Sequence, residues 1–365
     1  MGVENVILQG AYEKQVGIHY EINPSESPLG TGGSGTVRHG LLVNEQSGTT
    51  REVAIKFLFD DLNENAISRS RREASIHIVH ENLVEMLGFM QIGEPQLYGK
   101  SNVHYHVISE YLQGVMLLDL INGKTQDQSG KESPAVIEFL NLYRSNRKKF
   151  AVKIIRSVLS GVLALHDNGY IHRDIDPSNI MITNDGKVKL IDLGIAKRLS
   201  NLTTQDGHTM LGQFIGKAAY AAPEQIRGDI RSQNHTTDIY AIGIMFFQLV
   251  TGSLPFIGST DEVIDKQLNA KMPLRDISDM GIRKIIKTAT EKKQSDRFQS
   301  AAEFRVALEQ LDKNFSGSGY KYRKNDAAGC SKPTEKGMIA SWQTILLWSG
   351  VVAVGIAIGI LGAML

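Results

Sequence analysis

The sequence of 365 residues is poor in cysteine and in net charge. Its single cysteine, Cys330, excludes an intramolecular disulfide framework and suits a reducing compartment. Forty basic and 39 acidic residues leave a formal net charge of +1, so no overall basic field indicates a nucleic-acid partner. The amino-terminal residues also lack a basic stretch followed by an apolar run, and no cleavable signal peptide is predicted.

Charged residues are missing altogether from the carboxyl end. None occurs from Met338 to Leu365, and residues 344–365 are almost wholly apolar. At about 1.5 Å per residue, a helix of that length spans about 33 Å, close to the bilayer core of about 30 Å. The sequence therefore predicts one transmembrane helix over 344–365. The alternative is a buried helical hairpin of a soluble domain, but this run has no polar face.

Basic residues precede the apolar run and none follows it. The preceding segment contains Lys321, Arg323, Lys324, Lys332 and Lys336. By the positive-inside rule, we expect the domain before the run in the cytoplasm and the chain end in or just beyond the membrane, without an extracellular sensor. Gly355 and Gly359 form a small-residue pair at helical spacing, which makes a second copy of the chain a candidate partner.

Two kinds of pattern divide the rest of the chain. From about residue 18 to 112, short β-branched segments predict antiparallel strands, for example at 52–57 and 105–109, with one helix over about 64–79. Beyond residue 112, apolar-periodic segments predict helices, at 136–167, 236–252, 261–269 and 301–311.

This order predicts an α+β fold with two lobes, a sheet-rich N-lobe at 18–112 and a mostly helical C-lobe at 113–312. Residues 1–17 carry no clear pattern and are interpreted as an N-terminal extension. Residues 313–343 begin polar and rich in Gly and Ser, which predicts a flexible juxtamembrane linker. Within the lobes, the loop at 122–134 is longer than a simple connection requires.

Three polar residues in the C-lobe point to phosphoryl transfer. Asp174 and Asn179 lie in one short segment, and Asp192 follows in Asp-Leu-Gly. One carboxylate can orient a hydroxyl nucleophile, while an amide and a second carboxylate hold the Mg²⁺ that neutralises phosphate charge. Here the chain resembles the eukaryotic-like (Hanks-type) Ser/Thr protein kinase family. The resemblance implies Asp174 as the catalytic base, Asn179 and Asp192 as metal ligands, and ATP with Mg²⁺, or Mn²⁺ as a substitute, as cofactors.

A glycine-rich segment in the N-lobe fits the phosphate-binding loop of this family. Its predicted cofactor-binding residues are Gly30, Thr31, Gly32, Gly33, Ser34, Gly35 and Val37. Glycine lets backbone amides approach phosphates because no Cβ stands in the way. A dinucleotide-binding loop would instead open a helix, but residues 37–43 favour a strand.

Further family motifs follow in order. Val53-Ala54-Ile55-Lys56 resembles the family's lysine motif, which implies that Lys56 contacts the phosphates and pairs with a helix glutamate, Glu73. The segment 109–112 resembles the hinge, with Ser109 as a small gatekeeper. Ala54, Glu110 and Leu112 are then the residues expected around adenine. The resemblance also implies a buried Glu224–Arg297 ion pair and a brace from Asp238 to the catalytic loop.

Two positions depart from the family pattern. Asp176 stands where a lysine usually meets the γ-phosphate, and Gly216-Lys217 stands where Gly-Thr is usual. An unpaired carboxylate there is costly, because like charges at about 4 Å repel by roughly 4 kcal/mol at an effective dielectric of about 20. Our hypothesis is that Lys217 pairs with Asp176 and brings its ammonium to the γ-phosphate, which makes Lys217 a further catalytic candidate. The alternative is a damaged site.

The resemblance implies an ATP-dependent enzyme that phosphorylates Ser/Thr hydroxyls of protein substrates in signalling. The apolar run predicts that it is tethered to a membrane, which similarity to bacterial kinases indicates is the inner one; a eukaryotic tail-anchored kinase is the alternative. Arg173 beside the base implies a loop ordered by phosphate, with autophosphorylation candidates Ser200, Thr203, Thr204 and Thr209. A membrane-anchored pseudokinase that acts as a scaffold is the alternative that Asp176 supports. A small-molecule phosphotransferase of the antibiotic-kinase type is a third, although such enzymes typically lack the Ala-Pro-Glu segment.

Overall fold

The computed structural model describes residues 4–93, 103–193, 197–198 and 218–316. The chain divides into two units, 1–316 and 317–365, and only the first contains described residues. No helix in those described ranges is both long enough and apolar enough to cross a membrane. The predicted linker beyond residue 316 and the predicted helix at 344–365 lie outside the described residues, so the membrane anchor stays a prediction.

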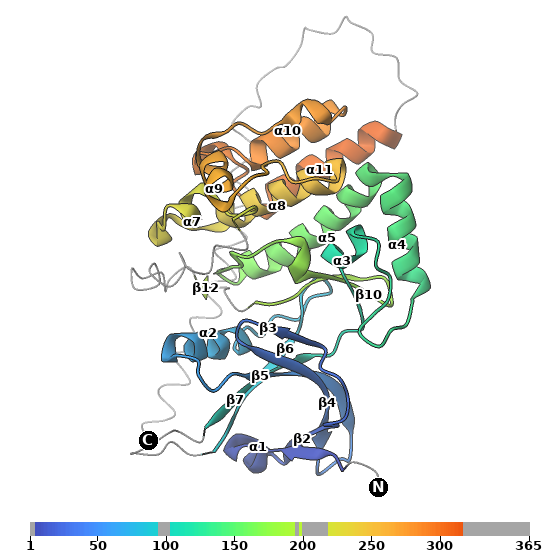
Figure 1. The fold of residues 1–365 in the computed structure, drawn as a ribbon, viewed down its shortest axis with the longest axis vertical. Coiled ribbons are helices and arrows are strands. Elements are labelled where there is room, and N and C mark those ends of the chain that lie inside the picture. The colour runs from blue at the N-terminus through green and yellow to red at the C-terminus, as the bar shows by residue number, and fades with distance from the viewer. Residues whose placement is uncertain (1–3, 94–102, 194–196, 199–217, 317–365) are drawn as a thin grey trace, which may run out of the picture. The chain divides into compact units, whose positions relative to one another are not determined.

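A seven-stranded antiparallel sheet forms the N-lobe, in the order β1-β2-β4-β5-β7-β6 with β3 paired to β4. Figure 1 shows the sheet curling on itself. The strands are β1 (Val6–Leu8), β2 (Ile18–Ile22), β3 (Gly30–Gly32), β4 (Gly35–Asn44), β5 (Thr50–Leu58), β6 (Met86–Ile92) and β7 (His104–Glu110). The predicted strands at 52–57 and 105–109 are therefore present as β5 and β7.

The N-terminal extension contributes secondary structure to this lobe. Strand β1 pairs with β2, and Leu8 joins the buried cluster of Tyr20, Ile22 and Met90. Helix α1 (Ala11–Val16) follows at Gly10, where a Cβ would lie only 2.4 Å from the carbonyl oxygen of Gln91 in β6. Residues 4–16 thus pack against both ends of the strand order, which helps to curl the sheet.

Helix α2 (Glu64–Ala74) packs on the sheet through β6 and β7 and is shorter than predicted. Asn63 caps its start by accepting a hydrogen bond from the Ala66 amide at 2.9 Å. The expected helix ran to about residue 79, but Ser75 ends it by donating its hydroxyl to the Arg72 carbonyl. Ile76, Ile78 and Val79 follow outside the helix, and their β-branched side chains lower helix propensity. This end places Glu73 on the last turn.

The C-lobe is built around two helices, α5 and α8, that pack against each other (Figure 1). Its helices are α3 (Leu117–Ile121), α4 (Pro134–Ser145), α5 (Arg147–Asp167), α7 (Pro223–Ile226), α8 (His235–Thr251), α9 (Thr260–Asn269), α10 (Met280–Ala289) and α11 (Ala301–Ser316). Its small sheets pair β8 (Gly114–Met116) and β11 (Val188–Leu190) with β10 (Ile180–Thr183), and β9 (Tyr170–Ile171) with β12 (Lys197–Arg198).

One predicted C-lobe helix is in fact two. The apolar pattern over 136–167 predicted a continuous helix, but the backbone at Asn146 leaves the helical region with φ −151° and ψ 79°. Asn146 ends α4 through its own amide and starts α5 by accepting a hydrogen bond from the Lys149 amide at 3.0 Å. Periodicity missed this break because both helices bury apolar residues on either side of the cap.

Candidate active site

A cleft of about 530 Å³ opens between the N-lobe sheet and the C-lobe. Val37 of β4 and Ala54 of β5 line it from the sheet, and Met181 of β10 lines it from the C-lobe. Small and apolar side chains on two facing walls make a slot that suits a flat aromatic base. The cleft also reaches the polar groups Lys56, Glu73 and Asp192, so an apolar end and a charged end share one cavity.

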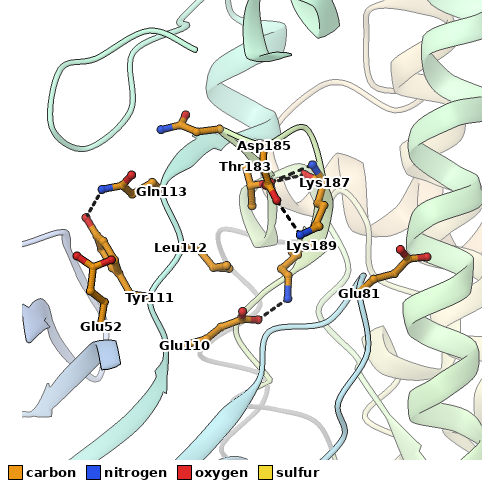
Figure 2. Close-up of a pocket in the computed structure, with 11 residues that line it drawn as sticks. Glu52, Glu81, Glu110, Tyr111, Leu112, Gln113, Thr183, Asp185, Lys187 and Lys189 are labelled. Carbon is orange, nitrogen blue, oxygen red and sulfur yellow. Dashed lines mark hydrogen bonds and ion pairs between the residues drawn. The ribbon is translucent and has the colours of Figure 1, made fainter. Parts of the chain in front are cut away.

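The hinge segment connects the lobes along one side of this cleft. Ser109, Glu110, Tyr111 and Leu112 all line it, as predicted for a segment that binds a base through its backbone. The Glu110 carboxylate is already engaged, since it accepts hydrogen bonds from Lys189 Nζ at 2.5 Å and from the Glu85 amide at 2.8 Å. Figure 2 shows the Glu110–Lys189 contact beside a second cavity of about 380 Å³.

The glycine-rich segment is a hairpin rather than a helix start. Gly30 pairs with Val37 and Gly32 with Gly35, so β3 and β4 meet at a tight turn of Gly33 and Ser34. A Cβ on Gly35 would lie 2.2 Å from the Phe57 carbonyl oxygen, so close packing on β5 requires glycine there.

The hairpin tip stands apart from the cleft. Of the predicted loop residues, all of which the structure describes, Gly30 and Val37 line the cleft. The remaining ones form the tip and do not, namely Thr31, Gly32, Gly33, Ser34 and Gly35.

Lys56 and Glu73 reach the charged end of the cleft from two different elements, β5 and α2. Among the described residues, no ion pair within 4.0 Å joins them. Glu73 is 5% exposed, and its Oε2 has no hydrogen-bond partner. Burial raises the pKa of Glu73 to about 7, the charge of Asp192 adds to this, and the charge of Lys56 opposes it. The predicted pair is thus adjacent but not closed.

The catalytic loop, residues 172–179, holds Asp174 and Asn179 together by hydrogen bonds. Asn179 Nδ2 donates to the Asp174 carboxylate at 3.0 Å and to the Asp174 carbonyl at 2.7 Å. The Asn179 carbonyl in turn accepts from the Ile191 amide at 2.8 Å, one residue before Asp192. Hydrogen bonds therefore join Asp174 to Asn179, and a backbone bond holds the residue next to Asp192 against Asn179.

Two residues at this site have a left-handed backbone. Arg173 has φ +73° and Asp192 has φ +58°, and they are the non-glycine residues with positive φ in the described part of the chain. Such conformations cost of order 1–3 kcal/mol unless the surroundings impose them, and they concentrate at functional sites. Arg173 directly precedes the predicted base Asp174, and Asp192 is itself a predicted metal ligand.

Asp238 of α8 fixes the backbone of the catalytic loop. The amides of His172 and Arg173 donate to its carboxylate at 2.8 and 2.7 Å, and His166 Nε2 lies 2.8 Å away. Burial alone would raise the pKa of Asp238, but the hydrogen bonds with His166 and the Arg173 amide outweigh it and hold the pKa below its ordinary value. Asp238 therefore carries its charge inside the protein and uses it to fix the loop.

The predicted buried ion pair is also present. Both terminal nitrogens of Arg297 donate to the Glu224 carboxylate, at 2.8 and 2.9 Å, and both side chains are almost fully buried. Thr237 donates to the same carboxylate at 2.9 Å. A bidentate pair with its remaining acceptor satisfied is the geometry in which a buried ion pair holds a segment in place.

Asp176 has a local structural role that sequence reasoning missed. It caps the short 3₁₀ helix Pro177–Asn179, accepting from the Ser178 amide at 2.6 Å and from the Ser178 hydroxyl at 2.5 Å. An aspartate before Pro-Ser is typical of such a cap, so the signal was available in the sequence. Lys217, its predicted partner, lies outside the described residues, as do Ser200, Thr203, Thr204 and Thr209.

The long loop after α3 was not assigned to the site, yet it lines the mouth of the cleft. The loop residues concerned are Lys124, Gln126, Asp127 and Gln128, beside Asp119 of α3. Asp127 anchors this loop by accepting from Asn184 Nδ2 at 2.8 Å and from the amides of Ser129 and Lys131. The sequence showed the length of this loop but not where it folds, because the anchor is a tertiary contact.

A lysine and a carboxylate at the polar end of an apolar slot, beside a second carboxylate held by an amide, form the arrangement used for phosphoryl transfer from a nucleotide. It places the chain among the two-lobed phosphotransferases. Comparison with known families agrees, because the model of the protein kinase domain matches residues 24–311. The chain belongs to the protein kinase family.

Two of the curated relatives are bacterial proteins. The chain is 34% identical over 277 residues to the probable serine/threonine-protein kinase PknB of Corynebacterium glutamicum, covering 72% of this chain and 38% of the relative. It is 32% identical over 267 residues to the serine/threonine-protein kinase PrkC of Bacillus subtilis, covering 71% and 36%. The chain thus matches little more than a third of the length of these two relatives.

Proposed function

We propose that this protein transfers the γ-phosphate of ATP to Ser or Thr hydroxyls of protein substrates. The observation that carries the proposal is the hydrogen-bonded pair Asp174 and Asn179, with the Asn179 carbonyl bonded to Ile191 next to Asp192. Asp192 and Lys56 both line the cleft. The names of the relatives support Ser/Thr as the acceptor class.

The donor set fits Mg²⁺ bound together with nucleotide. Asn179 uses its amide nitrogen on Asp174, which leaves the amide oxygen to face a cation, and Asp192 supplies a carboxylate that lines the cleft. Mg²⁺ is usually held by one or two protein oxygens plus phosphates and water, so two protein ligands suffice. When bound, Mg·ATP supplies the phosphoryl group and the charge neutralisation that its transfer requires.

The residues of the chain then divide the remaining work. The backbone of the hinge, at Glu110 and Leu112, holds the base, and Lys56 holds the phosphates by charge. The Asp174 carboxylate accepts the proton of the substrate hydroxyl, in an orientation fixed by Asn179. The Asp238 bonds to the loop keep that carboxylate in place during the transfer.

Transfer of labelled phosphate from Mg·ATP to the chain itself and to myelin basic protein tests the proposal. We expect transfer by the unmodified chain, and its loss in Asp174→Asn with ATP binding retained. Equal labelling by both forms, or ATP binding without any transfer, would reject the enzyme and favour the pseudokinase scaffold.

We further propose that Lys217 replaces the missing family lysine by pairing with Asp176. The support is electrostatic, because Asp176 is 4% exposed beside the catalytic loop and a buried carboxylate favours a cationic neighbour. Lys217→Thr should reduce turnover, and combining it with Asp176→Lys should restore part of the loss, because coupled sites are non-additive. Unchanged turnover in Lys217→Thr would reject the exchange.

We also propose that residues 344–365 anchor the kinase to a membrane, with residues 18–312 in the cytoplasm, and that the loop after Asp192 is autophosphorylated. The apolar run and the basic residues before it support the anchor. Protease treatment of intact and permeabilised bacteria should degrade the kinase only after permeabilisation, and recovery in the soluble fraction would contradict the anchor. Phosphosite mapping after incubation with Mg·ATP tests the second part, and an unmodified 196–216 peptide from an active enzyme would refute it.

A further inference from the structure

The acceptor segment, residues 218–225, lies against the catalytic loop. Gln225 Nε2 donates to the Arg173 carbonyl at 2.9 Å, one residue before the catalytic aspartate. Burial raises the pKa of the Tyr220 phenol, and the negative charge of Asp176 raises it further, so the phenol lies within electrostatic range of the same loop. The segment therefore lies beside the catalytic aspartate, next to the place where a polypeptide presents its hydroxyl.

Gln267 of α9 fixes the beginning of that segment. Its side chain is fully buried, at 0% exposure. Its amide nitrogen donates to the carbonyl of Ala219 at 2.5 Å and to that of Ala218 at 3.4 Å. These are side-chain bonds to backbone, so they set the path of the chain whatever side chains occupy 218 and 219.

A directed series of hydrogen bonds holds Gln267 itself. Lys292 Nζ donates to the Tyr240 hydroxyl at 2.8 Å and to the Gln267 carbonyl at 2.6 Å. The Tyr240 hydroxyl then donates to Gln267 Oε1 at 2.6 Å. Because Oε1 accepts from tyrosine, the orientation of the amide is fixed with its nitrogen toward the acceptor segment. Bonds linked in this way strengthen one another in a low-dielectric interior.

Lys292 lies beside two aromatic rings and near a second cation, Arg297. Lys292 lies 5.4 Å from the centre of the Tyr240 ring and 5.0 Å from that of Phe256. Burial lowers the pKa of Lys292 to about 8, Arg297 lowers it further, and Glu291 opposes them. Lys292 is only partly buried, yet its ammonium group makes three hydrogen bonds to this series, which argues for a positional role.

We propose that Gln267 is a positioning residue for the polypeptide acceptor: it holds the backbone of the acceptor segment where the protein substrate binds, without contacting nucleotide. The inference rests on the proposed function, since it assigns part of the substrate site for the same reaction. Gln267 lies far along the sequence from the motifs that contain Asp174, Asn179 and Asp192. A side chain that only filled the core would not need an amide nitrogen that donates to the backbone of this segment.

Gln267→Met tests the proposal, because methionine keeps the length and the helix propensity but cannot donate. In the full chain, we expect the KM for myelin basic protein to rise about tenfold, equivalent to about 1.4 kcal/mol, while the KM for ATP changes little. Hydrogen exchange should become faster at residues 218–222 and stay unchanged in the strands that line the cleft.

Two further variants sharpen the result. Tyr240→Phe keeps the ring but removes the hydroxyl that orients Gln267, so the KM for myelin basic protein should rise by a smaller factor. Asn269→Ala is the matched control, since Asn269 is exposed on the same helix and bonds only Asp265 at its surface. It should leave both KM values and the exchange rates unchanged.

An unchanged KM for myelin basic protein in folded Gln267→Met, or equal losses for ATP and protein, would overturn the proposal. Failure of the unmodified chain to phosphorylate any protein would reject the proposed function instead. The exchange measurement separates the two, because unaltered exchange at 218–222 in Gln267→Met would refute the positioning role without reference to activity.

Discussion

The two walls of the nucleotide cleft are held in different ways. On the C-lobe wall, Asp174 is bonded to Asn179, and the loop that carries both is bonded to Asp238. On the N-lobe wall, the Lys56 ammonium nitrogen and the Glu73 carboxylate oxygens are more than 4.0 Å apart, and both residues are described by the structure. The Oε2 atom of Glu73 is buried without a hydrogen-bond partner. The C-lobe residues are already hydrogen-bonded to one another, whereas Lys56 and Glu73 of the N-lobe have not formed their ion pair.

The difference follows from what each wall is built on. The catalytic loop is hydrogen-bonded to α8, of whose 17 residues 13 are buried, so its position is fixed by the core. Glu73 sits on the last turn of α2, a helix of 11 residues that packs on one face of the sheet. A short surface helix can shift at low cost, whereas a close-packed core cannot. The comparison indicates that the base is preorganised and that the lysine pair is adjustable.

Removing the base from the assembled wall should have the largest effect. Asp174→Asn should lower kcat by about 10²–10⁴-fold, because it eliminates proton acceptance while the loop remains bonded. Steady-state phosphotransfer and nucleotide-binding titration measure the two quantities. Asp167→Asn, an exposed carboxylate at the end of α5, is the control and should retain full activity. Weakened ATP binding in Asp174→Asn would mean that the wall itself had changed.

Breaking the buried Glu224–Arg297 ion pair of the C-lobe should have the next largest effect. Arg297→Ala leaves the Glu224 carboxylate buried and unpaired and should reduce the free energy of unfolding by about 3–5 kcal/mol. Arg305→Ala removes one partner of the exposed Arg305–Glu309 pair and should cost less than about 1 kcal/mol. Urea unfolding of both variants compares them. Similar losses in the two would deny that the C-lobe wall depends on its buried contacts.

On the adjustable wall, we expect a pH effect at Glu73. The pKa of Glu73 is about 7 in the folded chain and about 4.5 when unfolded, so the folded form binds the extra proton between these values. Its contribution to stability is full below pH 4.5 and is lost as the pH rises through 7. Without nucleotide, the melting temperature relative to Glu73→Gln should fall from pH 5 to pH 8. Parallel profiles for the two proteins would show that Glu73 ionises normally.

The smallest effect is expected at the start of α2. Asn63→Ala removes the cap of this helix and should cost about 1 kcal/mol. If the helix that carries Glu73 is the adjustable element, kcat should fall together with stability. Asn63→Ser retains a capping oxygen and should restore both. A stability loss with unchanged kcat would separate α2 from catalysis.

Sequence reasoning located the parts of the site that local motifs hold. Lys56 lies on β5, Asp192 lines the cleft, and Glu224 and Arg297 form their buried pair. Each was identified from a short motif, which does not depend on helical or strand periodicity. The break at Asn146 and the early end of α2 were missed, since a single capping residue interrupts an otherwise apolar pattern.

Other features depend on contacts between distant residues. The three-residue β1 and six-residue α1 are too short for periodicity to reveal, and Leu8 is buried only because it meets Met90. The loop that lines the cleft mouth is placed by Asp127 and Asn184, which are 57 residues apart. Gln267 likewise acts on a segment 48 residues away. No local pattern announces such partners.

A crystal structure of the chain with Mg²⁺ and a non-hydrolysable ATP analogue tests the central claim most directly. We predict that Lys56, Asn179 and Asp192 contact one nucleotide and its metal, that Lys56 and Glu73 close to within hydrogen-bond distance, and that the Asp174–Asn179 bond stays as it is. A nucleotide bound elsewhere, or these side chains too far apart to share one ATP with the lobes closed, would contradict the account.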